Sequence, residues 1–563
     1  MNTKYSSTFA RLKRLLDYPV TGKEDCPYLF LSIGRINDRA QVSCYKNNSN
    51  LPKNLEKELF TYIQSTNTEP CWLKIDYVHT IQEISFHHLK KDLENTRRNY
   101  VHKGFSLDQD FILAFLPQEI NANAFVRPRK GKDETSLFLS EQNINTYLKK
   151  YRNYNKTYAH IKYINKNVYT FETHSLFDDG KTIHVLYDHG NEYGIRKISE
   201  SNLNAEIDDL IKSATNYLLN EITETGSYNY GYLPHFDNRI GFYNVLRHCT
   251  STYALLEGVN YLGDFSHLDK IKRTIDYIWE NKTLHITEDP DDLYSFVFDD
   301  TPNVNEIKLG QNAGLILAMT KYMTITSTTE YLSACEKLAN GLSKMIDQDT
   351  GETIHVLNYP DLTIKERNRI IYYDGEAAFA LMRLYQLDAN VKWLNIVETL
   401  FSMFIENKYW QYHDHWLSYC TYELTLIEPK EEYFIFGLKN TAEHLDFIFN
   451  RDTTYPTFLE MMMACDKMIK TMKENGLETL ISAYMDVNKL HQTIEKRAEY
   501  QRTGYFYPEI AMYFKNPQRI VGSFFIKHHG YRVRIDDIQH YLSGYIQYRT
   551  FYTREGLANG RIQ

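Results

Sequence analysis

The chain has 563 residues, of which 14% are aromatic and 24% charged, and its net charge is −8. This length allows more than one domain, and the negative charge argues against non-specific nucleic-acid binding. The 46 tyrosines would suit a ligand with both polar groups and apolar faces, such as a sugar, although an AT-rich genome also enriches Tyr, Asn, Lys and Ile.

The seven cysteines are scattered and include no CxxC pair. We therefore expect neither a disulfide framework nor a structural zinc module. Charges run through the N-terminal residues without an apolar segment, so no signal peptide is predicted. No apolar run approaches the roughly 20 residues that a membrane helix needs. These features predict a cytoplasmic protein without membrane insertion.

The first 200 residues are predicted to form an α+β domain of unknown role. It could serve homo-oligomerisation or contact with a partner enzyme. Two hairpin signals stand out, because β-rich runs flank Asn37-Asp38 and Asp178-Asp179-Gly180. Strands are predicted at 28–36, 40–46, 71–84 and in each half of 169–190. Helices are predicted at 51–66 and 111–125.

Residues 201–550 show helical patterns in pairs, and residues 551–563 are predicted to be a tail. We predict twelve helices at 204–222, 243–260, 265–281, 309–325, 328–346, 374–388, 391–406, 415–428, 432–450, 455–474, 477–500 and 535–548. The first helix of a pair is amphipathic and the second is apolar almost all round, so the second helices should lie inside the first. This repeat predicts an (α/α)6 toroid, with an open solenoid as the alternative.

This rhythm of helix pairs, with polar aromatic loops before the inner helices, resembles the six-hairpin (α/α)6-toroid carbohydrate-active enzymes. These include glycoside hydrolases, polysaccharide lyases and sugar epimerases, and the sequence indicates no specific family among them. The resemblance covers about 204–550. It implies that the entries to the inner helices gather at one mouth and that a carbohydrate substrate binds there.

The entries to the predicted inner helices are rich in groups that bind or react, whereas the entries to the outer helices are not. Carboxylates at these entries are the candidates for acid–base catalysis, and they are Glu376, Asp414, Asp237 and Asp374. The candidate substrate-binding residues are His235, Arg239, Tyr243, Asn244, Arg247, His248, Gln311, Asn312, Tyr372, Tyr373, His413, His415, Trp416 and Asp537.

Most of these residues also have an ordinary structural interpretation. Asp374 would suit a helix N-cap, and a single histidine is more often structural than catalytic. Glu376 is followed by two alanines, which indicates tight packing, and a buried carboxylate needs a partner or a function. Trp416 would offer a stacking platform for a sugar. Arg247 lies inside an apolar helix and needs an anionic partner, either from the protein or from a substrate.

Paired carboxylates across a groove favour hydrolysis of a glycosidic bond in a polysaccharide or oligosaccharide. Glu376 would be the general acid, and Asp414 or Asp237 the base. One alternative is a uronic-acid epimerase or lyase with a His or Tyr base and Arg stabilisation. Another is a non-catalytic sugar-binding or scaffold subunit. We expect no cofactor and no metal, although Cys249 and Cys420 with nearby histidines leave a zinc site as a minor alternative.

Overall fold

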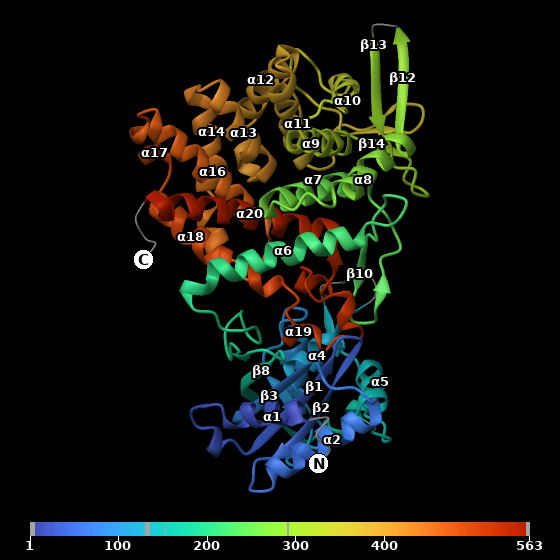
Figure 1. The fold of residues 1–563 in the computed structure, drawn as a ribbon, viewed down its shortest axis with the longest axis vertical. Helices are drawn as coiled ribbons and strands as arrows, with labels where there is room; N and C mark the ends of the chain where they lie inside the picture. The colour runs from blue at the N-terminus through green and yellow to red at the C-terminus, as the bar shows by residue number, and fades with distance from the viewer. Residues whose placement is uncertain (1–5, 130–135, 153, 290–291, 559–563) are drawn as a thin grey trace. The chain divides into compact units, whose positions relative to one another are not determined.

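The computed structural model describes residues 6–129, 136–152, 154–289 and 292–558, and Figure 1 shows its ribbon. The chain divides into two compact units. Unit 1 comprises residues 1–201, 232–239 and 503–533, and unit 2 comprises 202–231, 240–502 and 534–563. The predicted boundary at 200 coincides with the end of the first segment of unit 1, but the prediction did not include the two later segments that also belong to unit 1.

Unit 1 is built on an antiparallel sheet with the strand order β2-β1-β3-β8-β4-β5, to which β9 is added beside β8. Both predicted hairpins are present, β1–β2 and β8–β9. The strands of this sheet are β1 (Tyr28–Arg35), β2 (Asp38–Lys46), β3 (Trp72–Ser85), β4 (Gly104–Ser106), β5 (Ala114–Phe115), β8 (Asn167–Asp178) and β9 (Ile183–Val185).

Two hydrophobic cores hold the helices of unit 1 to its sheet. One contains Leu12, Leu55 and Ile75 from α1, α2 and β3. The other contains Leu89 and Leu148 from α3 and α5. The remaining elements are α1 (Ser6–Asp17), α2 (Leu51–Thr66), α3 (Phe86–Asn95), α4 (Pro117–Ala122), α5 (Glu141–Tyr151), α19 (Pro508–Ala511), β6 (Val126–Pro128), β7 (Leu137–Leu139), β10 (Gly231–Leu233), β11 (Asn238–Arg239) and β17 (Val533–Arg534).

The helix predicted over 111–125 is reduced to the short α4. Phe111 has a positive φ of 57°, a conformation that no helix interior contains, and β5 follows it. Pro117 then occupies the first turn of α4, where a proline is tolerated because its missing N–H is not needed. The apolar residues that suggested a longer helix are buried around this turn instead.

Unit 2 is helical, and six of its helices form a ring. Each inner helix contacts its two neighbours in the order α7, α9, α11, α13, α16, α20, and α20 contacts α7 to close the ring. The six inner helices are α7 (Val245–Leu262), α9 (Leu309–Thr326), α11 (Tyr372–Asp388), α13 (His415–Ile427), α16 (Thr457–Glu474) and α20 (Ile535–Ala558). This closure distinguishes the arrangement from an open solenoid.

Outer helices contact the inner ring from outside. The first of them, α6, contacts both α7 and α20. The outer helices are α6 (Leu203–Glu221), α8 (Leu268–Asn281), α10 (Leu332–Lys344), α12 (Val391–Glu406), α14 (Glu431–Ala442), α15 (Leu445–Phe449), α17 (Glu478–Tyr484) and α18 (Val487–Tyr500). Two predicted helices are each broken into two, since α14 and α15 replace 432–450 and α17 and α18 replace 477–500.

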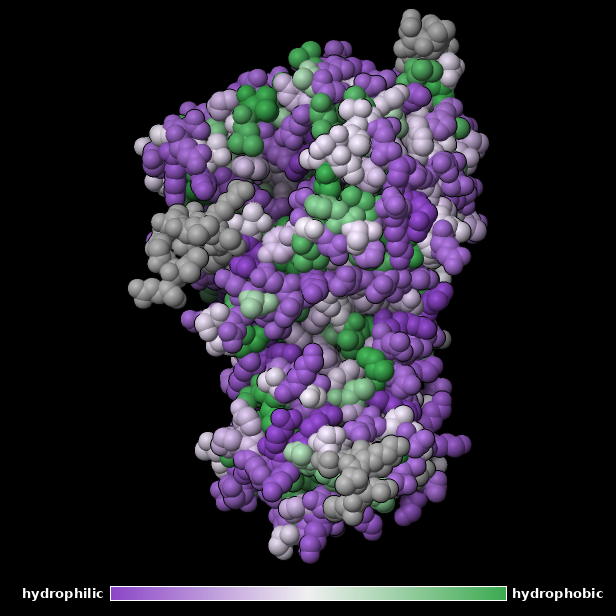
Figure 2. All heavy atoms as spheres, in the orientation of Figure 1, coloured by the Kyte–Doolittle hydropathy of each residue, from purple (hydrophilic) through white to green (hydrophobic). Residues whose placement is uncertain are grey.

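Unit 2 also contains short strands that the sequence pattern does not predict. A hairpin joins β12 (Thr283–Asp289) to β13 (Asp292–Val297), and a three-stranded sheet contains β14 (Glu306–Lys308), β15 (Val356–Asn358) and β16 (Ile364–Glu366). The predicted tail begins inside α20, which continues to Ala558, and residues 559–563 lie outside the described residues. No helix in the described ranges is long and apolar enough to cross a membrane. The face in Figure 2 is mostly hydrophilic, with scattered hydrophobic groups.

Candidate functional site

Five inner helices of unit 2 contribute polar side chains to one group, which we call the ring cluster. Its members are Arg247 of α7, Glu376 of α11, His415 of α13, Glu460 of α16 and His540 of α20. The rings of the two histidines lie edge to face with their centroids 5.1 Å apart. The charge of Arg247 acts on the pKa values of both Glu376 and His540. Residues far apart in sequence therefore share one electrostatic environment.

Glu376 is a buried carboxyl group, 1% exposed, whose Oε2 has no hydrogen-bond partner. Burial raises its pKa to about 8, with the Asp414 charge adding to the rise, and Arg247 and a hydrogen bond from Trp416 oppose it. Gly310 of α9 allows this close fit, because a Cβ at that position would lie 1.9 Å from Oε2. Glu376 is therefore protonated at neutral pH.

Asp414 is the N-cap of α13 and also orients His415. Its carboxylate accepts hydrogen bonds from the backbone N–H groups of Trp416 and Leu417, at 3.0 and 3.3 Å. The same carboxylate lies 3.3 Å from Nδ1 of His415. An imidazole that donates from Nδ1 carries its lone pair on Nε2. Nε2 of His415 is buried and has no hydrogen-bond partner, so it is available as a base.

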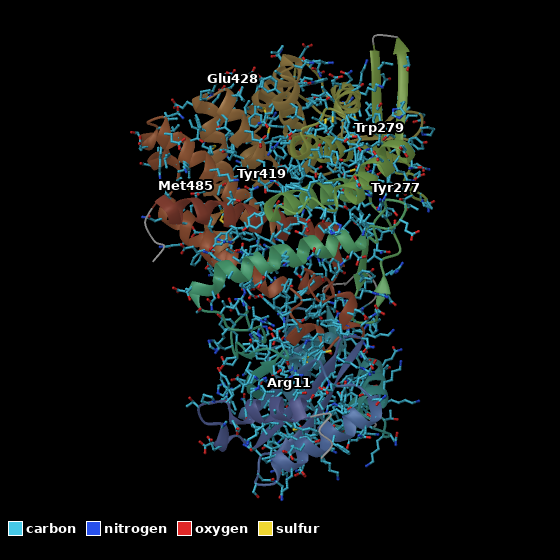
Figure 3. All side chains as sticks on the ribbon, viewed as in Figure 1. Arg11, Tyr277, Trp279, Tyr419, Glu428 and Met485 are labelled. Atoms are coloured by element: carbon cyan, nitrogen blue, oxygen red, sulfur yellow. The ribbon has the colours of Figure 1, made fainter. Side chains whose placement is uncertain are left out.

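Glu460 and His540 form a buried hydrogen-bonded pair. Oε2 of Glu460 lies 2.9 Å from Nδ1 of His540, and the Tyr419 hydroxyl donates to Oε1 at 3.2 Å; Figure 3 labels Tyr419. Burial raises the pKa of Glu460 to about 8. Burial and the nearby charge of Arg247 lower the pKa of His540 to about 4. The shared proton therefore resides on Glu460, and His540 presents an N–H at Nε2.

Arg247 connects the ring cluster to the start of α20. Its Nε lies 3.6 Å from Asp536, and Arg534 pairs with both Asp536 and Asp537, at 2.8 and 3.0 Å. The side chains of Arg247 and Arg534 are 27% and 20% exposed, so they form an accessible edge of the cluster. Asp537, predicted to bind substrate, pairs with Arg534.

Three tyrosines lie beside the cluster. The hydroxyl groups of Tyr372 and Tyr455 are 3.3 Å apart, and the Tyr372 ring lies edge to face with His415 at 5.8 Å. Tyr455 is 37% exposed. Tyr373 is buried, and the charge of Glu376 adds to the rise in its pKa. Tyr372 and Tyr373 thus both contact the region predicted for substrate binding.

Two other candidates next to the cluster have structural partners. Asp374 is buried, accepts a hydrogen bond from the Thr353 hydroxyl at 2.6 Å and lies 3.1 Å from Nε2 of His355. Trp416 is only 2% exposed. Its ring therefore offers no free face to a sugar, and its indole N–H donates a hydrogen bond to Glu376 instead. The predicted stacking platform at Trp416 does not exist in this structure.

The candidates around the start of α7 hold that helix in place. Asn244 is its N-cap, and the Tyr243 hydroxyl bonds to Nδ1 of His248 at 2.7 Å. Nε2 of His248 lies 2.9 Å from the Thr274 carbonyl of α8, and its ring stacks on that of Tyr277, a residue labelled in Figure 3. His248 therefore joins an inner helix to an outer one and has no free nitrogen.

Three more candidates bind backbone atoms. Gln311 and Asn312 are fully buried and bond to the carbonyl and the N–H of Val297, respectively. Nδ1 of His413 lies 2.8 Å from the Asn440 carbonyl. These side chains satisfy buried backbone groups, which are costly to leave unpaired, and none belongs to the ring cluster.

The structure assigns three of the candidates to unit 1. Asp237 pairs there with Arg519 at 2.8 Å, and Arg239 is exposed on β11. Nδ1 of His235 lies 3.0 Å from the Ala122 carbonyl. The prediction assumed that the whole loop before α7 belongs to the toroid, but residues 232–239 belong to unit 1. Asp237 is therefore not a member of the ring cluster, and we do not propose it as the base.

Glu460 of the ring cluster and Tyr419, which donates a hydrogen bond to it, are not among the candidates that the sequence predicts. Both lie within the first five residues of inner helices, after the entry loops. One signal was present for Glu460, since it is a lone charge in the apolar run FLEMMMAC. A charge in such a run requires a partner, and His540 is that partner.

The pair of histidines with Glu460 also resembles a set of metal ligands. One ligand atom from each of His415, Glu460 and His540 lies within 4.8 Å of the other two, and two imidazoles with a carboxylate suit zinc or iron. The cysteines considered for zinc, Cys249 and Cys420, are buried and free. Neither belongs to the one such group found in the described ranges.

Comparison with known proteins gives structural matches only. No family model and no curated protein matches the chain. The chain is similar to cellobiose 2-epimerase from Bacillus thermoamylovorans, at 11% identity and a TM-score of 0.46, over 62% of this chain and 100% of that one. It is also similar to a D-mannose isomerase, at 11% identity and a TM-score of 0.44, over 62% of this chain and 97% of that one. The GH76 α-mannanase of Bacteroides thetaiotaomicron matches at 10% identity, TM-score 0.32, and 62% and 87% coverage.

Proposed function

We propose that unit 2 is a carbohydrate-active enzyme that moves a proton at a sugar carbon next to a carbonyl or carboxylate group, as an epimerase does. The observation that carries this proposal is the pair of imidazoles in the ring cluster. Nε2 of His415 is unpartnered, and Asp414 holds its Nδ1. His540 faces it and receives a hydrogen bond from Glu460. One imidazole is thus arranged as a base and the other as an acid.

The proposed reaction uses these two groups in sequence. Nε2 of His415 takes the proton from carbon, and the electron pair moves onto the neighbouring carbonyl oxygen. Arg247, 27% exposed at the edge of the cluster, stabilises the resulting negative charge. His540 then returns a proton to the carbon from Nε2 and recovers one from Glu460 through Nδ1. The product is an isomer of the substrate.

Hydrolysis of a glycosidic bond is the second candidate, favoured by one observation. A pKa of about 8 keeps Glu376 protonated at neutral pH, as a general acid must be. Hydrolysis also needs a second carboxylate, and this requirement is less well met. Asp414 caps α13, and Asp536 is paired with arginines. A sugar-binding subunit without catalysis remains the third possibility from the sequence.

Product analysis tests these proposals. The full-length protein is incubated with a panel of neutral and acidic oligosaccharides, and the products are measured by mass and by NMR. We expect a product of unchanged mass and altered configuration. A gain of one water would favour the hydrolase, and an ultraviolet-absorbing unsaturated uronide would indicate a lyase.

Matched variants then assign the residues. His415→Gln and His540→Gln should each lower kcat by about 10²–10⁴-fold, the usual contribution of a general acid or base. His267→Gln replaces an exposed histidine of the same unit and should have wild-type activity. Full activity in both cluster variants would overturn the proposed roles. Loss of activity in Glu376→Gln alone would favour the hydrolase.

A further inference from the structure

Unit 1 contains a cavity of about 320 Å³ whose lining is positively charged. Four of its lining residues are cations, namely Arg39, Arg127, Lys150 and Lys515, and no lining residue is an Asp or Glu. The remaining polar lining groups are uncharged amides, hydroxyls and the neutral His235. The volume is at the lower end of the range for small-molecule sites.

Arg39 and Arg127 are half-buried, whereas Lys150 and Lys515 are exposed. Nε of Arg39 donates to the Tyr513 carbonyl at 2.9 Å and its Nη2 to the His235 carbonyl at 3.3 Å. Its guanidinium lies over the Tyr151 ring at 4.5 Å. Burial lowers the pKa of Arg39, and the nearby charge of Asp38 opposes this only in part. Among the residues that the structure describes, no carboxylate lies within ion-pair distance of its guanidinium. An anion in the cavity would compensate the charge of Arg39.

The other cations are also without carboxylate partners in the described ranges. Lys515 donates to the Phe236 carbonyl at 3.1 Å, and Arg127 lies over the Phe138 ring at 5.9 Å. Burial lowers the pKa of the neighbouring Arg98, and the charge of Arg127 adds to this decrease. Like charges that gather without counter-charges create a field that attracts anions, and arginine binds phosphate through paired hydrogen bonds.

Phe236 adds an apolar surface to this charged cavity. Its side chain is 46% exposed although it lines the cavity, so its ring is not needed to fill a core. An exposed aromatic ring beside cations is suited to a ligand that combines anionic groups with a ring.

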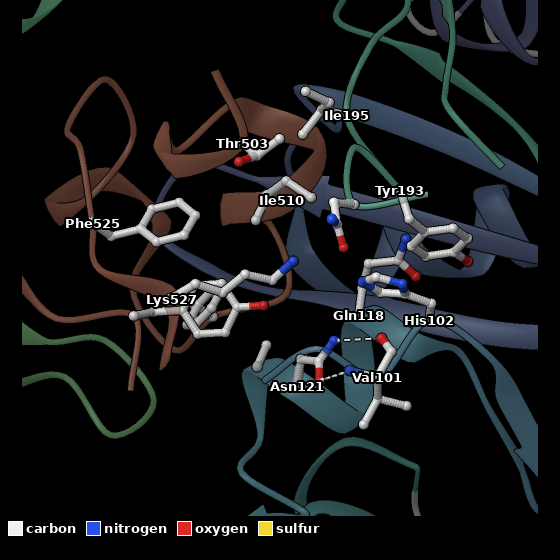
Figure 4. Close-up of a pocket in the computed structure, with 14 residues that line it drawn as sticks. Val101, His102, Gln118, Asn121, Tyr193, Ile195, Thr503, Ile510, Phe525 and Lys527 are labelled. Atoms are coloured by element: carbon white, nitrogen blue, oxygen red, sulfur yellow. Dashed lines mark hydrogen bonds between the residues drawn. The ribbon is translucent and has the colours of Figure 1, made fainter. Parts of the chain in front are cut away.

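A second cavity of unit 1 does not have these properties. Its volume is about 30 Å³, which accommodates roughly two water molecules. Lys527 is the only cation in its lining among the described residues, because burial lowers the pKa of His102 to about 3 and keeps that imidazole neutral. Figure 4 shows Lys527 and His102 among the amides and apolar side chains of this smaller cavity.

We propose that the larger cavity of unit 1 binds a small phosphate ester that carries a ring, such as a sugar phosphate or a nucleotide. Arg39, Arg127 and Lys515 hold the phosphate, and Phe236 stacks against the ring. This site is independent of the reaction proposed for unit 2.

Isothermal titration calorimetry on the full-length protein tests the site. The probes are uridine diphosphate and glucose 1-phosphate, with inorganic pyrophosphate as a probe without a ring and uridine as one without charge. We expect saturable binding of at least one ester, tighter than that of pyrophosphate, and no binding of uridine. The Kd should rise with added NaCl, because salt screens charge pairs.

Charge-matched variants separate a built site from general attraction. The double variant Arg127→Gln, Lys515→Gln should raise the Kd at least tenfold, because it removes two charge-assisted contacts. The double variant Lys53→Gln, Lys57→Gln removes two exposed charges on α2 and should change the Kd less than twofold. Phe236→Ala should weaken the esters but not pyrophosphate.

Three outcomes would overturn the proposal. They are no saturable binding of either ester, equal weakening by the two double variants, and pyrophosphate binding as tightly as the esters. Far-ultraviolet circular dichroism checks that each variant is folded, and Phe236→Ala provides a second test if the arginine variant is not.

Discussion

Two buried carboxyl groups, Glu376 and Glu460, make the stability of unit 2 depend on pH. Each has a folded pKa of about 8 against an ordinary value of 4.5, so the folded chain holds both protons more tightly than the unfolded chain. The stability that they contribute is complete below about pH 4.5. It is lost as the pH rises through about 8.

Glutamine in place of Glu376 should remove its share of this pH dependence. Between pH 5 and 8 the wild-type free energy of unfolding should lose about 1.4 kcal/mol per pH unit for each carboxyl. The free energy of unfolding of Glu376→Gln, relative to that of the wild type, should therefore increase as the pH rises. Urea unfolding at pH 5, 6.5 and 8 measures this difference. As a control, Glu474→Gln changes an exposed position, and its free energy of unfolding should vary with pH as that of the wild type does. The same pH dependence in Glu376→Gln as in the wild type would contradict the account.

At the scale of single residues, the sequence indicated part of the site. Glu376, Arg247 and His415, which the structure places in the ring cluster, were candidates because each stands at or near the entry to an apolar helix. Glu460 was not found, although it lies in the first turn of α16, because the residues before it, Tyr455 to Leu459, include no charged group that marks this entry. Asp237 was misplaced because sequence alone does not show that the chain enters unit 1 for only eight residues.

At the scale of elements, Asp414 has two roles in α13, one in the stability of the helix and one in the proposed reaction. The side chain accepts two N–H groups of the first turn and holds His415. Asp414→Ala should therefore lower the free energy of unfolding by about 1–2 kcal/mol, the usual cost of a lost cap, and should lower activity as well.

Urea unfolding checks the stability part of this prediction. Asp446→Ala, at an exposed first-turn position of α15, should change stability by less than about 0.5 kcal/mol. If Asp414→Ala lost activity at unchanged stability, Asp414 would be a reacting group and not a cap.

The helices of unit 2 were predictable, whereas its strands were not. Apolar residues at helical spacing mark outer helices such as α12, which has to bury one face, and a long apolar run marks inner helices such as α9, which is buried almost all round. Strands such as β14 and β15 are only three residues long. Such a strand has too few residues to show alternation, and pairing with a distant segment decides its formation.

At the scale of the whole molecule, unit 1 is assembled from segments far apart in the chain. Tyr513 is buried and shares a hydrogen bond with Ser32 of β1 at 2.9 Å. Glu509 is buried and pairs with Arg196 at 2.8 Å. The sequence gives no sign of this return, because residues 503–533 contain no long periodic element to distinguish them from a connection.

The isolated fragment 1–201 should therefore fail to fold cooperatively. It lacks the segment that contains Tyr513, the hydrogen-bond partner of Ser32, and Glu509, which pairs with Arg196. Thermal unfolding followed by near-ultraviolet circular dichroism should show no sharp transition, and joining 503–533 to the fragment through a flexible linker should restore one. A cooperative transition in 1–201 alone would show that the later segment is dispensable.

Proton transfer at carbon by His415 is the central claim, and deuterium uptake from solvent measures it directly. Reducing sugars, neutral and acidic, are incubated in D₂O with the full-length protein, and ¹H NMR follows the protons on carbons next to the carbonyl or carboxylate group. We expect one such signal to disappear with the wild type and to persist with His415→Gln. Conversion of a sugar without deuterium uptake, or uptake undiminished in His415→Gln, would contradict the account.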